Sequence, residues 1–187
     1  MDSARQHAEE VMRHYKKTGN RLHLEGMRAE LAGMYLNVRE FENVIEPSEK
    51  ALHFFEQVKH QRWISSLSNN LAEAYFETGQ IEKAKSYVHR VLQLEVARSR
   101  PYALYTLGLI HQYEDNLTHA ETAFLEGIRT AQDNTDPFIE AYLQRALGKM
   151  YLHFHEKDKS KAPLESAVQL FKKMGLESEV IETKKHH

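Results

Sequence analysis

The sequence predicts an all-α protein built from stacked antiparallel helix pairs, with about nine helices and a short C-terminal stub. Leu, Glu and Ala supply 59 of the 187 residues, whereas Val and Ile supply only 16. This balance favours helices, because good helix formers dominate and β-branched residues are scarce. A short apolar motif also recurs along the chain, and the apolar residues after each copy have helical spacing.

The recurring motif is a large apolar residue, then a small residue and, three positions after the small one, a ring-bearing residue. Its copies begin at Leu31, Leu71, Leu107 and Leu147, so successive copies lie 40, 36 and 40 residues apart. Because four residues add about one helical turn, units of both lengths keep the same face inward. The irregular spacing is therefore compatible with a regular stack.

A second apolar ladder follows each motif. In the second unit it consists of Ala84, Val88 and Val91, which lie at i, i+4 and i+7 on one helix face. Small residues in these ladders, such as Gly127 in the third unit, allow two helices to approach closely. Each unit is predicted to be two antiparallel helices joined by a short turn, for example over residues 78–80.

The units follow one another from the N-terminus. Ala4, Ala8 and Val11 continue the register, so residues 2–17 are predicted to be the second helix of an incomplete unit, a half repeat over 2–20. Natural arrays cap their ends with polar faces, so the open ends of this single array over 1–185 predict an excised piece of a longer protein. The complete units span about 22–60, 61–98, 99–135 and 137–175, a partial helix spans 176–185, and 186–187 are predicted to be a tag remnant.

The four prolines agree with this scheme in two different ways. Pro101 and Pro137 stand where a first helix begins, and Asp136 offers an N-cap before the second of these helices. Pro47 and Pro163 occupy equivalent places inside second helices, where each should bend the helix or delay its start. We favour a bend that follows the stack.

Composition excludes several classes of protein. The chain has no Cys, which excludes a disulfide scaffold, a thiol nucleophile and Cys-ligated metals. Its 25 basic and 27 acidic residues form no basic stripe, so we expect no direct nucleic-acid binding. No apolar run approaches the ~18 residues of a membrane helix, and the N-terminus lacks the apolar core of a signal peptide. We expect no membrane partner, and the cytoplasm is the default compartment.

The clearest copy of the motif runs from Leu71-Ala72 through Tyr75 and Gly79 to Ala84. This pattern resembles the tetratricopeptide repeat, whose signature places Leu, a small residue, Tyr, a turn and Ala at fixed spacings. The resemblance covers residues 4 to about 175. The family's early Trp and final Pro are absent, and the units exceed its standard of about 34 residues. Such long units are similar to those of bacterial regulators, peptide-pheromone sensors and kinesin light chains.

The resemblance implies a right-handed superhelical solenoid whose concave groove is lined by the first helix of each pair. Family members generally bind peptides or protein helices there and carry out no chemistry. Transferring the groove positions to this sequence predicts a partner-binding site. Its residues are Asn37, Asn69, Glu73, Phe76, Tyr102, Tyr105, Tyr113, Tyr142, Arg145 and Lys149.

This predicted groove is rich in aromatic residues with a polar tip, which protein interfaces favour. Arg145 and Lys149 lie at i, i+4 and together suit a carboxylate. Asn69 suits a peptide backbone, because its amide both donates and accepts. The alternative is that several of the tyrosines pack between units and that Arg145 pairs with a local Glu.

Catalytic and metal-binding patterns are missing from the sequence. Among its histidines no pair has the i, i+4 spacing that a helical zinc site needs. His111 is predicted to be a core histidine, because it lies on the apolar face of its helix. The nucleophile elbow, the dinucleotide fingerprint and the phosphate loop are absent as well. We therefore predict no enzyme, no catalytic residue, no metal site and no cofactor.

These observations together predict a protein- or peptide-binding interaction module. We expect it to be the sensor or scaffold segment of a larger multidomain regulator that binds through its concave groove. One alternative is a small-ligand or signalling-peptide sensor domain of a transcription regulator. Another is a self-assembly module that stacks on other copies through its open ends.

Overall fold

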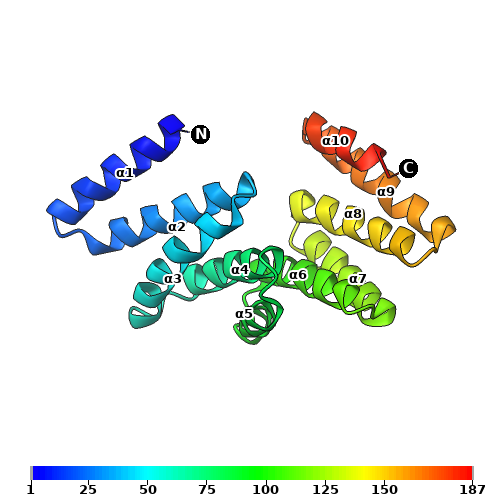
Figure 1. Cartoon of the computed structure of the whole chain (residues 1–187), viewed down its shortest axis with the longest axis horizontal. Coiled ribbons are helices and arrows are strands. Elements are labelled where there is room, and N and C mark those ends of the chain that lie inside the picture. Colours follow the sequence, from blue (N-terminus) through cyan, green and yellow to red (C-terminus); the bar gives the residue numbers. More distant parts are fainter. Residues whose placement is uncertain (1, 187) are drawn as a thin grey trace. The chain divides into compact units, whose positions relative to one another are not determined.

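The computed structural model describes residues 2–186, and side chains from residue 5 onward. The described residues form ten α-helices and one 3-10 turn and contain no strand, which confirms the predicted all-α helical repeat fold (Figure 1). The Ala4 side chain, predicted to face inward, and the predicted tag residue His187 lie outside the described residues.

The chain divides into two compact units, and the boundary in the sequence lies between Val96 and Ala97. Within each unit, consecutive helices pack against one another along the chain. The first unit contains α1 (Asp2–Lys17), α2 (Arg21–Asn37), α3 (Phe41–Gln57), α4 (Gln61–Glu77) and α5 (Ile81–Gln93). The second contains the 3-10 turn η1 (Ala97–Ser99), α6 (Arg100–Tyr113), α7 (Leu117–Asp133), α8 (Pro137–His153), α9 (Lys157–Lys173) and α10 (Glu177–Lys184).

The turns between helices share one backbone feature. Each contains a residue with positive φ, and Gly fills this place at Gly19, Gly79 and Gly175. In eight turns the amide of the next residue donates to a carbonyl five positions back, at 2.7–3.0 Å. This is the Schellman arrangement, which satisfies the free carbonyls at a helix end. The other positive-φ residues are Arg39, Lys59, Glu95, Asp115, Thr135 and His155.

The short second unit of the sequence repeat has a structural cause. Helix α5 has 13 residues, whereas α3, α7 and α9 each have 17. One helical turn is therefore missing from α5, so the apolar face of the chain keeps its register.

The proline positions agree in part with prediction. Pro137 begins α8, and the Asp136 Oδ1 atom accepts a hydrogen bond from the Ile139 amide at 3.3 Å, as an N-cap does. Pro47 and Pro163 lie inside α3 and α9, which begin well before them, so neither proline delays its helix. A bend at these prolines stays a prediction.

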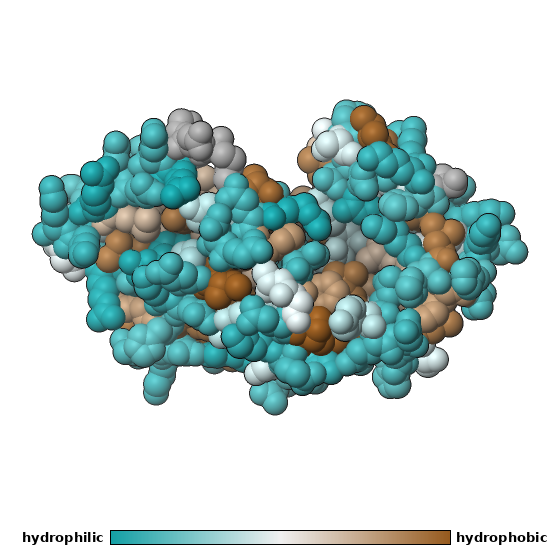
Figure 2. Space-filling model, viewed as in Figure 1, coloured by the Kyte–Doolittle hydropathy of each residue, from teal (hydrophilic) through white to brown (hydrophobic). Residues whose placement is uncertain are grey.

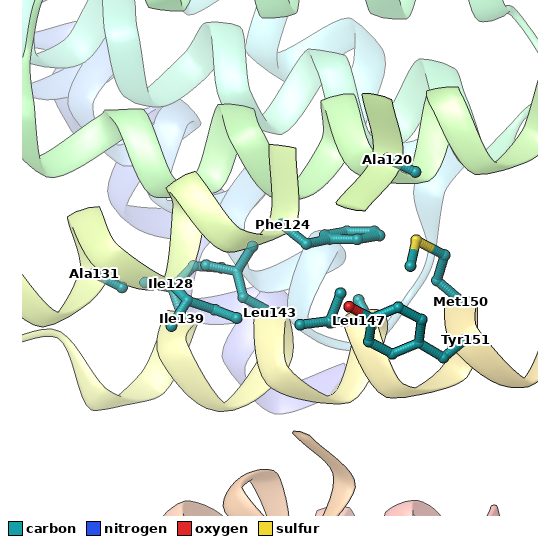
Figure 3. Packing of buried hydrophobic residues seen from close by; sticks show 10 residues of the cluster. Ala120, Phe124, Ile128, Ala131, Ile139, Leu143, Leu147, Met150 and Tyr151 are labelled. Atoms are coloured by element: carbon teal, nitrogen blue, oxygen red, sulfur yellow. The ribbon is translucent and has the colours of Figure 1, made fainter. Parts of the chain in front are cut away.

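Glycines in the second unit mark the closest helix contacts. A Cβ atom on Gly108 would lie 2.4 Å from the Phe124 ring, and one on Gly148 would lie 2.6 Å from Leu164 Cγ. Figure 3 shows the adjoining core, where side chains of α7 and α8 such as Phe124 and Met150 point toward one another. The predicted role of these small residues in close helix packing is thus confirmed for this unit.

The aromatic residue of the motif ties first helices to second helices. The Tyr75 hydroxyl donates a hydrogen bond to Glu49 on α3 at 2.5 Å, and the Tyr151 hydroxyl donates to Glu121 on α7. In the third copy His111 takes this place. Its side chain is half-buried, with the Nδ1 atom 3.6 Å from a Glu114 carboxylate oxygen.

Candidate binding surface

The candidate surface is the side of the first helices that does not pack against the second helices. We name the part on α2 and α4 the first face, and the part on α6 and α8 the second face. On α4, Leu71, Ala72 and Tyr75 are buried, whereas the predicted groove positions lie along the opposite stripe of the helix. This division follows from helical periodicity, because residues three or four apart share a face.

The first face carries four of the predicted residues. Asn37 is exposed at the end of α2, while Asn69, Glu73 and Phe76 are half-buried on α4. The three α4 residues lie at i, i+4 and i+7, so the structure brings an amide, a carboxylate and an aromatic ring together along one helix.

Glu73 is the electrostatically unusual group of the first face. Burial, together with the neighbouring Glu77 carboxylate, raises the pKa of Glu73 to about 7, and the Arg39 charge opposes this shift. A carboxyl group poised near neutral pH on an accessible helix face is a candidate functional group.

A glycine on the neighbouring helix α2 leaves open space on the first face. Gly33 holds on α2 the repeat position that Glu73 holds on α4, and these two helices contact each other. A Cβ atom on Gly33 would meet no heavy atom within 4 Å. The neighbouring helix therefore presents bare backbone where the other repeats have a side chain.

The second face contains several aromatic side chains. Tyr102, Tyr105 and Tyr142 are half-buried against the core between α7 and α8, so part of each ring remains accessible. Tyr113 is 68% exposed. The Tyr102 hydroxyl donates to Asp136 Oδ2 at 3.1 Å, and burial together with this carboxylate raises its pKa.

The pairing of Arg145 corrects one interpretation of the sequence. Its guanidinium donates to Glu179 Oε2 on α10 at 2.6 Å and lies 4.8 Å from the Tyr142 ring centre and 5.2 Å from that of Phe171. The side chain is only 13% exposed, so it does not stand ready with Lys149 for an external carboxylate. Arg145 thus pairs with a Glu, as the alternative expected, but this Glu lies 34 residues later on α10 and is not local in sequence. Lys149 is exposed.

Phe138 is a member of the second face that the sequence interpretation missed. It is 42% exposed on α8, and its ring centre lies 4.9 Å from that of Tyr142. Its position four residues before Tyr142 and seven before Arg145 is the signal that could have found it.

The side of the molecule shown in Figure 2 is mostly polar. On the side that Figure 2 shows, hydrophilic residues dominate and apolar residues appear in separate patches. Among the described residues, no three His, Asp or Glu side chains are placed to hold a metal ion. No helix in this part of the chain is both long and apolar enough to cross a membrane.

Comparison with known proteins agrees with the repeat architecture. A family model of the tetratricopeptide repeat matches residues 65–95, which include most of α4 and all of α5. Response regulator aspartate phosphatase A of Bacillus subtilis (strain 168) is 26% identical over 116 residues. That match covers 60% of this chain and 31% of the relative, so it spans about a third of the relative's length.

Solved structures show the same fold at low sequence identity. BtubC (BKLC) from P. vanneervenii has a TM-score of 0.67 at 17% identity, covering 99% of this chain and 88% of its own. A Podosopora anserina putative kinesin light chain, with nearly identical TPR-like repeats, has a TM-score of 0.54 at 15% identity. It covers 93% of this chain and 98% of its own. The chain thus has the fold of TPR-like helical repeat proteins, and residues 65–95 match the tetratricopeptide repeat.

Proposed function

We propose that this chain binds a peptide or protein segment along the accessible side of its first helices, as the sensor or scaffold part of a larger regulator. The observation that carries the proposal is the second face, where Tyr105, Tyr113, Phe138 and Tyr142 leave aromatic surface accessible on α6 and α8. Such side chains supply large contact areas at a low entropic cost, and interfaces are enriched in them.

The regulatory part of the proposal is supported by the B. subtilis relative, whose name describes a response regulator aspartate phosphatase. We do not extend the phosphatase activity in that name to this chain, because its sequence carries no catalytic motif and matches only 31% of the relative. We propose that the chain contributes recognition, and that it works in the cytoplasm.

Selection from a phage-displayed library of random linear peptides tests this function. The wild-type chain should enrich a peptide consensus, and Tyr113→Ala/Phe138→Ala should reduce binding of the enriched peptides about tenfold or more, as loss of two interface aromatics does. Leu125→Ala is the matched control, because Leu125 is 49% exposed on the second helix α7.

The control should bind as the wild type does, and circular dichroism should show that all variants remain helical. Equal loss of binding in the control and the double variant would contradict the proposal. A small-ligand sensor would instead give no peptide consensus and a thermal midpoint that rises only with the small molecule.

Self-association through the ends is a second candidate. It is favoured by Ile181 on α10, which is 61% exposed. If copies stack there, the mass measured by light scattering should rise with concentration, and Ile181→Glu should abolish the rise. A constant mass of one chain at all concentrations would contradict this candidate.

A further inference from the structure

The strongest unused feature of the molecule is the Glu73 carboxylate on the first face. Within the described chain it forms no hydrogen bond and no ion pair, although it is half-buried. The Glu73 side-chain oxygens have no partner, yet they do not belong to the fully buried unpaired atoms of the described chain. Solvent therefore reaches them. Because a half-buried charge is costly unless it is paired, this position is suited to an external partner.

The charged groups nearest Glu73 do not supply that partner. Glu77, on the same helix, is a like charge, and its carboxylate lies 3.7 Å from the Arg39 guanidinium of the turn after α2. Arg39 is therefore engaged with Glu77, and it also lies 5.2 Å from the Phe41 ring centre. Arg39, the cation that lowers the pKa of Glu73, thus contacts Glu77 and Phe41 and does not form an ion pair with Glu73.

The other helices that pack against α4 do not neutralise Glu73 either. On α3, Glu49 accepts the hydrogen bond of the Tyr75 hydroxyl, and on α5 the Lys83 ammonium lies 4.7 Å from the Tyr75 ring centre. Both charges are held at Tyr75, which lies on the opposite, buried side of α4. Among the described residues of this unit, the charge of Glu73 remains unbalanced.

We propose that Glu73 is the specificity-determining residue of the first face and accepts a cationic side chain, Lys or Arg, of a bound peptide. Gly33, at the same repeat position on the contacting helix α2, leaves open space on this face, and Phe76 lies one helical turn from Glu73 along α4. This inference rests on the proposed function, because it names the partner chemistry of the same surface.

The proposed contact also makes peptide binding depend on the protonation of Glu73. Since the pKa of Glu73 is about 7 in the free protein, about half of these carboxyl groups carry a proton at neutral pH. A bound cation favours the ionised form, so the peptide binds in exchange for that proton. For one coupled carboxyl group, affinity should fall about tenfold between about pH 8 and about pH 6.

The test uses peptides from the phage selection described above, made with their central Lys or with Nε-acetyl-lysine. The wild-type chain should enrich peptides with Lys or Arg at one fixed position and should prefer Lys over acetyl-lysine by about tenfold or more. Glu73→Gln should remove this preference and flatten the pH dependence, while Glu73→Asp should restore part of both. The matched control is Glu42→Gln, because Glu42 is an exposed carboxylate on the second helix α3.

The outcomes separate this inference from the proposed function. If peptides are enriched without a fixed cationic position, or if Glu73→Gln keeps the lysine preference and the pH dependence, the role of Glu73 is overturned and the binding function stands. If no peptide is enriched by the wild-type chain, both proposals fall.

Discussion

At the scale of single residues, the charged side chains Glu73 and Arg145 are both partly or largely buried, but only Arg145 has a partner of opposite charge. Arg145 is nearly covered, yet Glu179 and two aromatic rings satisfy its guanidinium. Glu73 is half-buried without a partner in the described chain. The first arrangement stabilises a helix contact, whereas the second leaves a binding group at a cost to stability.

That cost can be measured. The pKa of Glu73 is about 7 when folded and 4.5 as an ordinary Glu, so between these values the folded chain holds a proton that the unfolded chain has released. Stability contributed by this group is therefore full below about pH 4.5 and is lost as pH rises toward 7. Glu73→Gln should raise the free energy of unfolding by about 1–2 kcal/mol at about pH 8 and by much less at about pH 5.

Urea denaturation of the two proteins at both pH values checks this prediction, with Glu42→Gln as the control for removing an exposed charge. An equal effect of Glu73→Gln at the two pH values would contradict it.

The partner of Arg145 is a residue contact that could not be predicted from the sequence. The repeat placed Arg145 on the accessible side of a first helix, but its partner lies 34 residues later on another helix. Which carboxylate reaches the guanidinium depends on how α10 packs, and helical periodicity alone does not contain that information. Phe138, in contrast, shares its helix with Tyr142 and was predictable from spacing.

At the scale of helices and turns, the repeat was sufficient to predict the helix pairs, because each apolar ladder has its own period and register. The turns were harder to recognise from local signals. Only Gly19, Gly79 and Gly175 mark a positive-φ position with the expected residue, and six other turns in the described chain use residues with a Cβ atom. The register of the apolar ladders, rather than turn composition, indicated where one helix ends and the next begins.

Thr135 is the most demanding of these turn residues, because a β-branched side chain is disfavoured at its φ of 54°. Thr135→Gly should therefore raise the free energy of unfolding by about 1 kcal/mol. Chemical denaturation measures the change, and Gly79→Ala, at a turn with φ of 76°, should shift stability in the opposite direction. A loss of stability in Thr135→Gly would show that the side chain contributes contacts that outweigh the strain.

Glycines within helices have two different roles, which one pair of substitutions separates. Gly33 has open space around its missing Cβ, so Gly33→Ala should stabilise the chain by about 0.5–1 kcal/mol through helix propensity. At Gly148 a Cβ would lie 2.6 Å from Leu164 Cγ, so Gly148→Ala should destabilise it by about 1–3 kcal/mol. Thermal unfolding of both variants tests the signs, and two shifts of the same sign would refute this distinction.

At the scale of the whole molecule, the helical repeat fold is shown, whereas the peptide-binding function is our proposal. The all-α repeat fold followed from composition and periodicity, and the solved structures share it at 15–17% identity. The binding surface was predicted only as a set of positions. Which of those side chains are accessible, engaged or electrostatically perturbed depends on packing between helices that are distant in sequence.

Hydrogen–deuterium exchange of the full chain, with and without a peptide enriched by phage display, tests the central claim most directly. The peptide should slow exchange in the first helices of the unit that it contacts, α2 and α4 or α6 and α8, because it lies along their accessible sides. Slowing confined to the second helices α3, α5, α7 and α9, or to α1 and α10 at the ends, would contradict the proposed binding surface.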